Sequence, residues 1–345
     1  MIIIKEKPDC KWDFVSLGEL LLRFDPGDAR ISDAREFRIW DGGAEYNVAA
    51  DLSRVFSLDV SFVSMLHNNA IGRLAYKMAM QSGIDTSNIN KVESGRNGLY
   101  FIERGFGPRA ADSAFDREHT AISTADSMSF DWNAIFSKGV RWFHTSGIFA
   151  GLSDITPEAA STAMLAAREN GTIVSYDLNY RDSLWRNRGG RVAANQVNRK
   201  LLPFADVVFG VLDFNSQLND YNTDAFSIAA TEMQRQFPNI KIIISTLRNT
   251  HSSNRHDLSG VCYSNGNVFK ASVRENIDVF DRIGSGDAFA AGFIYGMLEN
   301  KGEKFAVDCG VALGTLAMTT PGDVAAVTAE EVFAFMKNSD ATAIR

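Results

Sequence analysis

The stretch DRIGSGDAFAAGF, residues 281–293, combines two carboxylates, two glycines and a serine with the apolar start of a buried helix. Gly284 and Gly286 let the backbone turn sharply and bring amide N–H groups close to a ligand. The helix that we predict to begin near Asp287 adds its own unpaired amides, which favour an anion. Ser285 and Asp287 could also be ordinary helix caps, but a cap alone would not need both glycines. The spacing therefore predicts an anion site.

Such a site suits the transfer of a phosphoryl group to a hydroxyl. The amides of residues 284–286 would stabilise charge on the transferring phosphoryl oxygens, and Asp287 would accept the hydroxyl proton as the new bond forms. The chain has no G-x-x-x-x-G-K-[ST] sequence and no G-x-G-x-x-G after its first strand. The missing phosphate fingerprint in the first β–α turn disfavours a dehydrogenase.

Strands and helices must alternate to position these residues. Helical spacing occurs at 44–56 and 156–171, and apolar runs predict strands at 13–24, 58–66, 140–148, 172–179, 205–211 and 240–247. This alternation predicts an α/β fold with a mostly parallel sheet covered on both faces. Residues 28–41 and 95–120 do not fit it, so we assign them to a small β lid over the site. No linker marks a boundary, and we expect one domain over residues 1–345.

Polar residues gather where the predicted strands end. They form the segments GE (18–19), TSG (145–147), DLNYR (177–181) and TLR (246–248). Ligands of open parallel sheets bind beyond the carboxyl ends of the strands, so the sequence predicts a site assembled from several strands.

Composition narrows the class of partner. The formal net charge is −7 and there is no long Lys/Arg run, which argues against nucleic acid. No apolar run is long enough to span a bilayer, and the apolar start is too short for a signal peptide, so we expect a cytoplasmic protein with no membrane partner. The three cysteines lack metal or redox spacing. His251 and His256 lie in a polar segment that we interpret as an exposed loop and not as a metal site.

Two signatures in the right order carry a resemblance to a known family. DRIGSGDAFAAG resembles the C-terminal signature of the ribokinase-like (PfkB) carbohydrate kinases, and DGGAEYNVAADLSR (41–54) resembles their N-terminal glycine pair. With GLYFIE (98–103), YDLNYRDSLW (176–185) and TTPGD (319–323), the chain is most similar to 2-keto-3-deoxygluconate kinases. The resemblance implies a ribokinase-like three-layer αβα sandwich. It also implies ATP-dependent phosphorylation of the terminal hydroxyl of a keto sugar acid, 2-keto-3-deoxygluconate becoming 2-keto-3-deoxy-6-phosphogluconate.

The resemblance implies roles only at matching positions. Asp287 would be the catalytic base, and Gly284, Ser285 and Gly286 would form the anion hole. The substrate-binding residues implied are Gly42, Gly43, Asn47, Tyr100, Arg117, Ile148, Arg181 and Asp287. The nucleotide-binding residues implied are Asn179, Arg181, Thr246, Arg248, Gly284 and Gly286.

Simpler structural roles compete with these assignments. Arg117 and Arg181 could be solvated surface residues. The glycine pair at 42–43 could form a plain turn, and Tyr100 could be packing in a lid strand. An Arg pair would nevertheless suit the carboxylate of a 2-keto acid, because the guanidinium fork binds carboxylates in a bidentate way.

The chain departs from the family at the residues that orient water molecules around the metal ion. Val211 and Phe214 stand where relatives have an Asn-x-x-Glu motif that organises Mg²⁺ through water, which leaves Asp213 as a weak candidate for metal handling. Phe115 stands where some sugar-acid kinases have tyrosine. Alternatives therefore stay open: a kinase for fructose, tagatose phosphate or 5-keto-2-deoxygluconate, or a degenerate kinase that senses sugar or nucleotide. The resemblance also leads us to expect a homo-oligomer formed through the lid.

Overall fold

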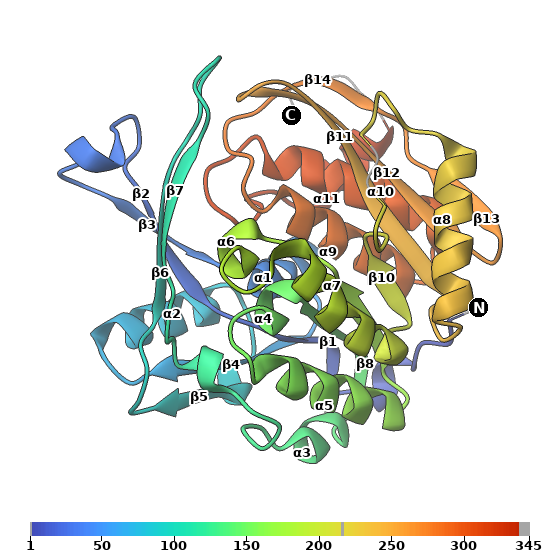
Figure 1. The fold of residues 1–345 in the computed structure, drawn as a ribbon, viewed down its shortest axis with the longest axis horizontal. Helices are drawn as coiled ribbons and strands as arrows, with labels where there is room; N and C mark the ends of the chain where they lie inside the picture. The colour runs from blue at the N-terminus through green and yellow to red at the C-terminus, as the bar shows by residue number, and fades with distance from the viewer. Residues whose placement is uncertain (1, 215–216, 338–345) are drawn as a thin grey trace.

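The computed structural model describes residues 2–214 and 217–337. Its ten-stranded central sheet has the order β13-β12-β11-β10-β9-β8-β1-β4-β5, with β14 paired to β12 (Figure 1). The strands are β1 (Trp12–Leu17), β4 (Val60–His67), β5 (Ile89–Val92), β8 (Val140–Ser146), β9 (Ile173–Asp177), β10 (Val207–Phe209), β11 (Ile242–Ser252), β12 (Arg255–Ser264), β13 (Asn267–Lys270) and β14 (Arg274–Asp278). The run from β5 to β11 is parallel, and β12 pairs antiparallel with its neighbours.

Helices cover both faces of this sheet, which gives the three layers that the sequence predicts. Successive strand residues point to opposite faces, so Phe14 and Trp142 pack on one side while Val15 and Phe143 pack on the other. The first side is covered by α1 (Ala44–Phe56), α2 (Ala70–Gln81), α9 (Ser285–Leu298), α10 (Gly302–Ala317) and α11 (Ala329–Lys337). The second is covered by α3 (Trp132–Phe136), α4 (Gly147–Ala150), α5 (Thr156–Glu169), α7 (Gly190–Leu201) and α8 (Thr223–Gln236).

A second, four-stranded sheet stands beside the carboxyl ends of the central strands (Figure 1). Its order is β3-β2-β6-β7, formed by β2 (Leu21–Asp25), β3 (Arg38–Gly42), β6 (Gly98–Glu103) and β7 (Asp112–Asp116). We call this sheet the lid. It lies over the site as expected, and its β3, β6 and β7 fall in or next to the predicted lid segments.

The prediction of one strand over residues 13–24 is wrong. The chain leaves the central sheet after β1 and enters the lid as β2. The break falls at Gly18, where a Cβ would lie 2.2 Å from the Oε2 atom of Glu45. Apolar side chains continue through the break because both sheets bury them, so hydrophobicity alone does not reveal the change of sheet.

The polar segment around His251 and His256 is not a loop, although its His251 side chain is exposed as predicted. It forms the antiparallel hairpin of β11 and β12, in which Thr250 pairs with His256. The His256 side chain is buried, and His251 Nε2 lies 2.7 Å from an oxygen of Asp257. No helix in the described part of the chain is long and apolar enough to cross a bilayer.

The packing of α9 generates a stability prediction. Phe293 is fully buried, and its ring centroid lies 5.9 Å from that of Phe209 on β10. Phe293→Ala should lower the free energy of unfolding by about 3–5 kcal/mol, because it leaves a cavity in a close-packed core. Chemical denaturation followed by circular dichroism measures this change. Ile228→Ala on α8, where the side chain is 70% exposed, should change it by less than about 0.5 kcal/mol. Equal effects of the two changes would contradict the buried position of α9.

Candidate active site

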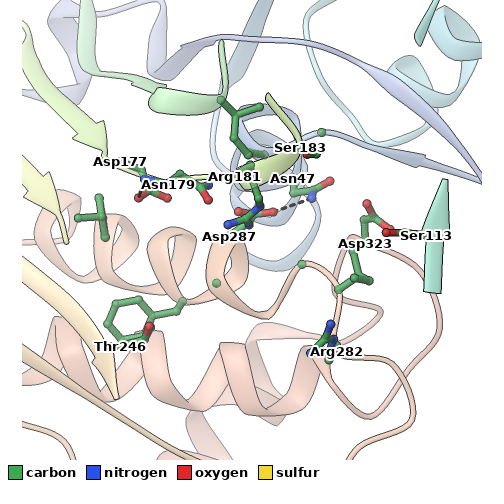
Figure 2. A pocket seen from close by; sticks show the side chains of 18 of the residues that line it. Asn47, Ser113, Asp177, Asn179, Arg181, Ser183, Thr246, Arg282, Asp287 and Asp323 are labelled. Atoms are coloured by element: carbon green, nitrogen blue, oxygen red, sulfur yellow. Dashed lines mark hydrogen bonds between the residues drawn. The ribbon is translucent and has the colours of Figure 1, made fainter. Parts of the chain in front are cut away.

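A cavity of about 780 Å³ lies between the lid and the carboxyl ends of the central strands (Figure 2). The lid, the start of α1, the ends of β9 and β10, the middle of β11 and the start of α9 all contribute to its walls. Twelve of the residues singled out by the sequence line it: Gly43, Asn47, Tyr100, Arg117, Ile148, Asn179, Arg181, Thr246, Arg248, Gly284, Gly286 and Asp287. Gly42, Ser285 and Asp213 are not among the lining residues.

The turn before α9 is fixed by close backbone contact. Gly284 has a φ of 76°, and a Cβ there would lie 1.8 Å from the carbonyl oxygen of Asp323. Gly286 has no heavy atom within 4 Å of a built Cβ, so its backbone is open to the cavity. The Ser285 hydroxyl is buried and donates to the Gly314 carbonyl at 2.9 Å. This turn thus presents backbone amides to the cavity, while the serine side chain anchors it from behind.

Asp287 lies in the first turn of α9 and faces the cavity (Figure 2). The side-chain amide of Asn47 donates to its Oδ2 at 2.7 Å. Desolvation raises the pKa of Asp287 well above its ordinary value, and the nearby Asp177 and Asp323 add to the rise, whereas Asn47 and Arg181 partly offset it. A carboxyl group with raised proton affinity is suited to take a proton from a bound hydroxyl.

Gly42 and Gly43 are required by the protein's own packing. Gly43 has a φ of 140°, and a Cβ there would lie 2.0 Å from the carbonyl oxygen of Glu19. A Cβ on Gly42 would lie 2.3 Å from Oδ2 of Asp323. The glycine pair is therefore more than a plain turn: it lets the start of α1 approach both neighbouring segments, which brings Asn47 to the cavity.

Tyr100 and Arg117 enter the cavity from the lid. Tyr100 is buried, stacks on Phe115 with ring centroids 5.4 Å apart, and donates its hydroxyl hydrogen bond to Asp323. Arg117 is only 10% exposed in its side chain and forms an ion pair with the buried Glu19. Its Nε atom has no hydrogen-bond partner within residues 2–214 and 217–337. Arg117 is thus not a solvated surface residue, although Glu19 already neutralises part of its charge.

Three arginines face the cavity. Arg181, Arg248 and Arg282 line it, and none of them forms an ion pair with a carboxylate in the described part of the chain. Burial lowers the pKa of Arg248, and Arg282 and Arg181 lower it further. Arg248 donates to the Ser285 hydroxyl at 3.1 Å. Uncompensated guanidinium groups beside an open helix N-terminus favour a multiply charged anion such as a polyphosphate.

The sequence reasoning missed Asp177, Arg282 and Asp323 as members of the site. Asp177 ends β9, and burial raises its pKa to about 6 although Arg181 partly offsets the effect. Burial also raises the pKa of Asp323 to about 6. The strand-end rule that singled out DLNYR could have identified Asp177. Asp323 ends the TTPGD segment that the resemblance includes, but that segment assigns it no role, and it reaches the cavity from the loop after α10.

The weak metal candidate Asp213 points elsewhere. Its carboxylate accepts hydrogen bonds from Asn195 and Arg199 of α7, at 2.5 and 2.7 Å, and it is exposed. Val211 is buried and Phe214 packs against the same core. Among residues 2–214 and 217–337 no group of three His, Cys, Asp or Glu side chains could hold a metal. Mg²⁺ commonly needs only one or two protein carboxylates, together with substrate phosphates and water. Asp177 in the cavity wall could supply one such carboxylate.

This arrangement of an α/β sandwich, a small lid and an acid at a glycine-rich helix start defines a phosphotransferase architecture. The family model for pfkB family carbohydrate kinases matches residues 13–213 and 255–330, so the chain belongs to this family.

Individual relatives are similar over nearly the whole chain. A 2-dehydro-3-deoxygalactonokinase of Haloferax volcanii is 29% identical, covering 95% of this chain and 98% of its own. A 5-dehydro-2-deoxygluconokinase of Clostridium perfringens is 24% identical, covering 90% and 88%. The crystal structure of 2-dehydro-3-deoxygluconokinase from Thermotoga maritima matches with a TM-score of 0.87 and 34% identity, covering 94% and 99%. The chain is a carbohydrate kinase of the pfkB family.

The two glycines of the α9 turn should respond differently to alanine. Gly284→Ala should lower the free energy of unfolding by at least about 2 kcal/mol, because it forces a left-handed conformation and a clash with the Asp323 carbonyl. Gly286→Ala should change it by less than about 0.5 kcal/mol, since the position is open. Urea unfolding of both variants provides the comparison. A stable Gly284→Ala protein would show that this contact does not shape the turn.

Proposed function

We propose that the protein transfers the γ-phosphoryl group of ATP to the terminal hydroxyl of a 2-keto-3-deoxy sugar acid, with 2-keto-3-deoxygluconate as the first candidate. The observation that carries the proposal is Asp287, a desolvated carboxyl group that Asn47 holds in a cavity lined also by Arg181, Arg248 and Arg282 and by the lid. A phosphoryl donor and a hydroxyl acceptor would meet at this carboxylate.

The donor would bind along α9, the end of β9 and the middle of β11. The open amides at Gly284 and Gly286 and the guanidinium groups of Arg248 and Arg282 would hold phosphate oxygens, while Thr246 and Asn179 line the adjoining wall. These fixed donors face the region where charge develops as the phosphoryl group moves. Arg181, which lies beside Asp287 in Figure 2, would bridge donor and acceptor.

Mg²⁺ would accompany the nucleotide. When bound, it would supply positive charge that stabilises the phosphate oxygens of the donor. Asp177, a carboxylate in the cavity wall, would be the residue that holds it. Val211 is buried and Phe214 packs against the same core, so neither offers a polar side chain to orient water around the metal ion. We therefore expect weaker metal binding than in kinases with the Asn-x-x-Glu motif.

The acceptor would bind beneath the lid, against Asn47, Tyr100, Arg117 and Ile148. Asp287 takes the proton of the hydroxyl as the bond to phosphorus forms. The unpartnered Nε of Arg117 offers a donor to a substrate carboxylate. This feature, together with the names of the two similar 2-dehydro-3-deoxy sugar-acid kinases, supports an acidic substrate over a neutral one.

A second candidate substrate is 5-keto-2-deoxygluconate, because a 5-dehydro-2-deoxygluconokinase is also similar along the chain. Fructose and tagatose phosphate remain alternatives within the same reaction. A pure sugar or nucleotide sensor is less well supported, because binding alone does not need a desolvated base. We also propose a cytoplasmic location, where ATP is abundant, and association of subunits through the lid.

Replacing the base tests the reaction directly. Asp287→Asn should lower kcat by about two to four orders of magnitude while nucleotide affinity stays nearly unchanged, because it removes the proton acceptor and keeps the size. Because the pKa of Asp287 is raised, wild-type kcat/KM should fall as pH drops through a value above that of an ordinary aspartate, about 4. The variant should lack this acid limb. A variant with most of the wild-type rate would remove Asp287 from the mechanism.

A substrate panel tests the choice of acceptor. With Mg²⁺ and ATP, kcat/KM for 2-keto-3-deoxygluconate should exceed that for fructose by at least tenfold, since a desolvated Arg–carboxylate contact contributes about 1.5–3 kcal/mol. The panel should include 2-keto-3-deoxygalactonate and 5-keto-2-deoxygluconate, measured by coupled release of ADP. Equal values for fructose and the keto acids would contradict an acidic substrate, and no transfer to any sugar would favour a sensor.

A further inference from the structure

Arg23 is the most completely enclosed charge on the lid. It lies on β2 with none of its side chain exposed, and it lines no part of the cavity. Its guanidinium group binds three carboxylates. Nη1 lies 2.9 Å from Asp323, and Nη2 lies 2.9 Å from Asp25 and also contacts Asp281.

Two of these acids belong to the active-site segments. Asp281 begins the turn that leads to Gly284, and its Oδ1 accepts the backbone N–H of Ile283 at 3.1 Å. The Asp323 carboxylate accepts a hydrogen bond from the Tyr100 hydroxyl, and the Asp323 backbone carbonyl packs against Gly284. Arg23 therefore connects a lid strand with both sides of the turn that presents amides to the cavity.

The three carboxylates that contact Arg23 depend on its positive charge. Three buried carboxylates share one guanidinium, and the only other cation within 4 Å of any of them in the described chain is Arg104, whose Nε is 3.8 Å from Asp25. Buried carboxylates without a partner are costly, so loss of Arg23 would drive Asp281 and Asp323 apart or force them to bind protons. A lysine could supply the charge but could not span the acids with a planar fork.

We propose that Arg23 is a positioning residue that makes the lid and the phosphate-binding turn one mechanical unit. The lid then cannot move away from Asp323 without also loosening the turn at Gly284. The effect on turnover rests on the proposed function, whereas the coupling of the two segments does not.

Arg23→Ala tests the proposal, with Arg141→Ala as the matched control. Arg141 is also a buried arginine that binds a carboxylate, Asp13 at 2.8 Å, but it lies at the start of β8 and lines neither the cavity nor the lid. Arg23→Ala should lower kcat/KM by about a hundredfold, the scale seen when catalytic groups shift by about 1 Å. Arg141→Ala should keep the rate within a few-fold even if its melting temperature falls.

Guanidinium ion separates positioning from general destabilisation. At concentrations well below those that unfold proteins, guanidinium ion should raise the kcat/KM of Arg23→Ala at least tenfold. The ion can occupy the space that the Arg23 side chain leaves between the three carboxylates. It should leave wild type and Arg141→Ala unchanged. Unimpaired turnover of Arg23→Ala, or no recovery with guanidinium, would overturn the proposal.

Hydrogen exchange provides a readout that needs no sugar. In Arg23→Ala the amides of β2, β6 and residues 281–287 should exchange faster together, while those of β8 and β9 keep their wild-type rates. Arg23→Lys serves if the alanine variant does not fold, and it should show the same pattern to a smaller degree. Faster exchange in the lid alone, or exchange like that of wild type, would contradict the coupling. If wild type phosphorylates no sugar, the proposed function fails, and this measurement still decides the role of Arg23.

Discussion

The chemistry of the site depends on the balance of forces on one carboxyl group, that of Asp287. Desolvation and the neighbouring Asp177 and Asp323 favour its protonated form, while Asn47 and Arg181 favour its charged form. The start of α9 adds the positive end of a helix dipole. This balance gives a carboxyl group that can hold a proton inside the cavity. The surrounding arginines can neutralise the negative charge that a phosphate donor brings.

The rest of the fold keeps that group in place. The apolar side of α9 is buried against the central sheet through residues such as Phe293, so the helix cannot shift its first turn. Close contacts of Gly43 with Glu19, and of both Gly42 and Gly284 with Asp323, bring four separate parts of the chain together. Asn47 reaches Asp287 because of these contacts, which explains why glycines are needed where the site has no room for a Cβ.

Much of this arrangement follows from local sequence. Alternating strands and helices predict the layered sheet, and the glycines with Asp287 predict an acid beside an anion site. The path of residues 13–24 could not be predicted, because an apolar run is equally compatible with one sheet or two, and only the contact of Gly18 with Glu45 locates the break. The contact of Asp323 with Tyr100 and the pairing of Arg117 with Glu19 could not be predicted either, since they are contacts between distant segments. The hairpin after Arg248 could not be recognised from its composition, because polar residues occur in loops as well as in paired strands.

Burial raises the pKa of Asp287, so this residue keeps a proton at pH values where ordinary aspartates have lost theirs. Difference infrared spectroscopy of ¹³C-aspartate-labelled protein, wild type minus Asp287→Asn, follows the carbonyl stretch of a protonated carboxyl group as pH rises. A band assigned to Asp287 should persist well above the ordinary aspartate range and disappear when the group ionises. Loss of this band at the pH of an exposed aspartate, about 4, would contradict the raised pKa of Asp287.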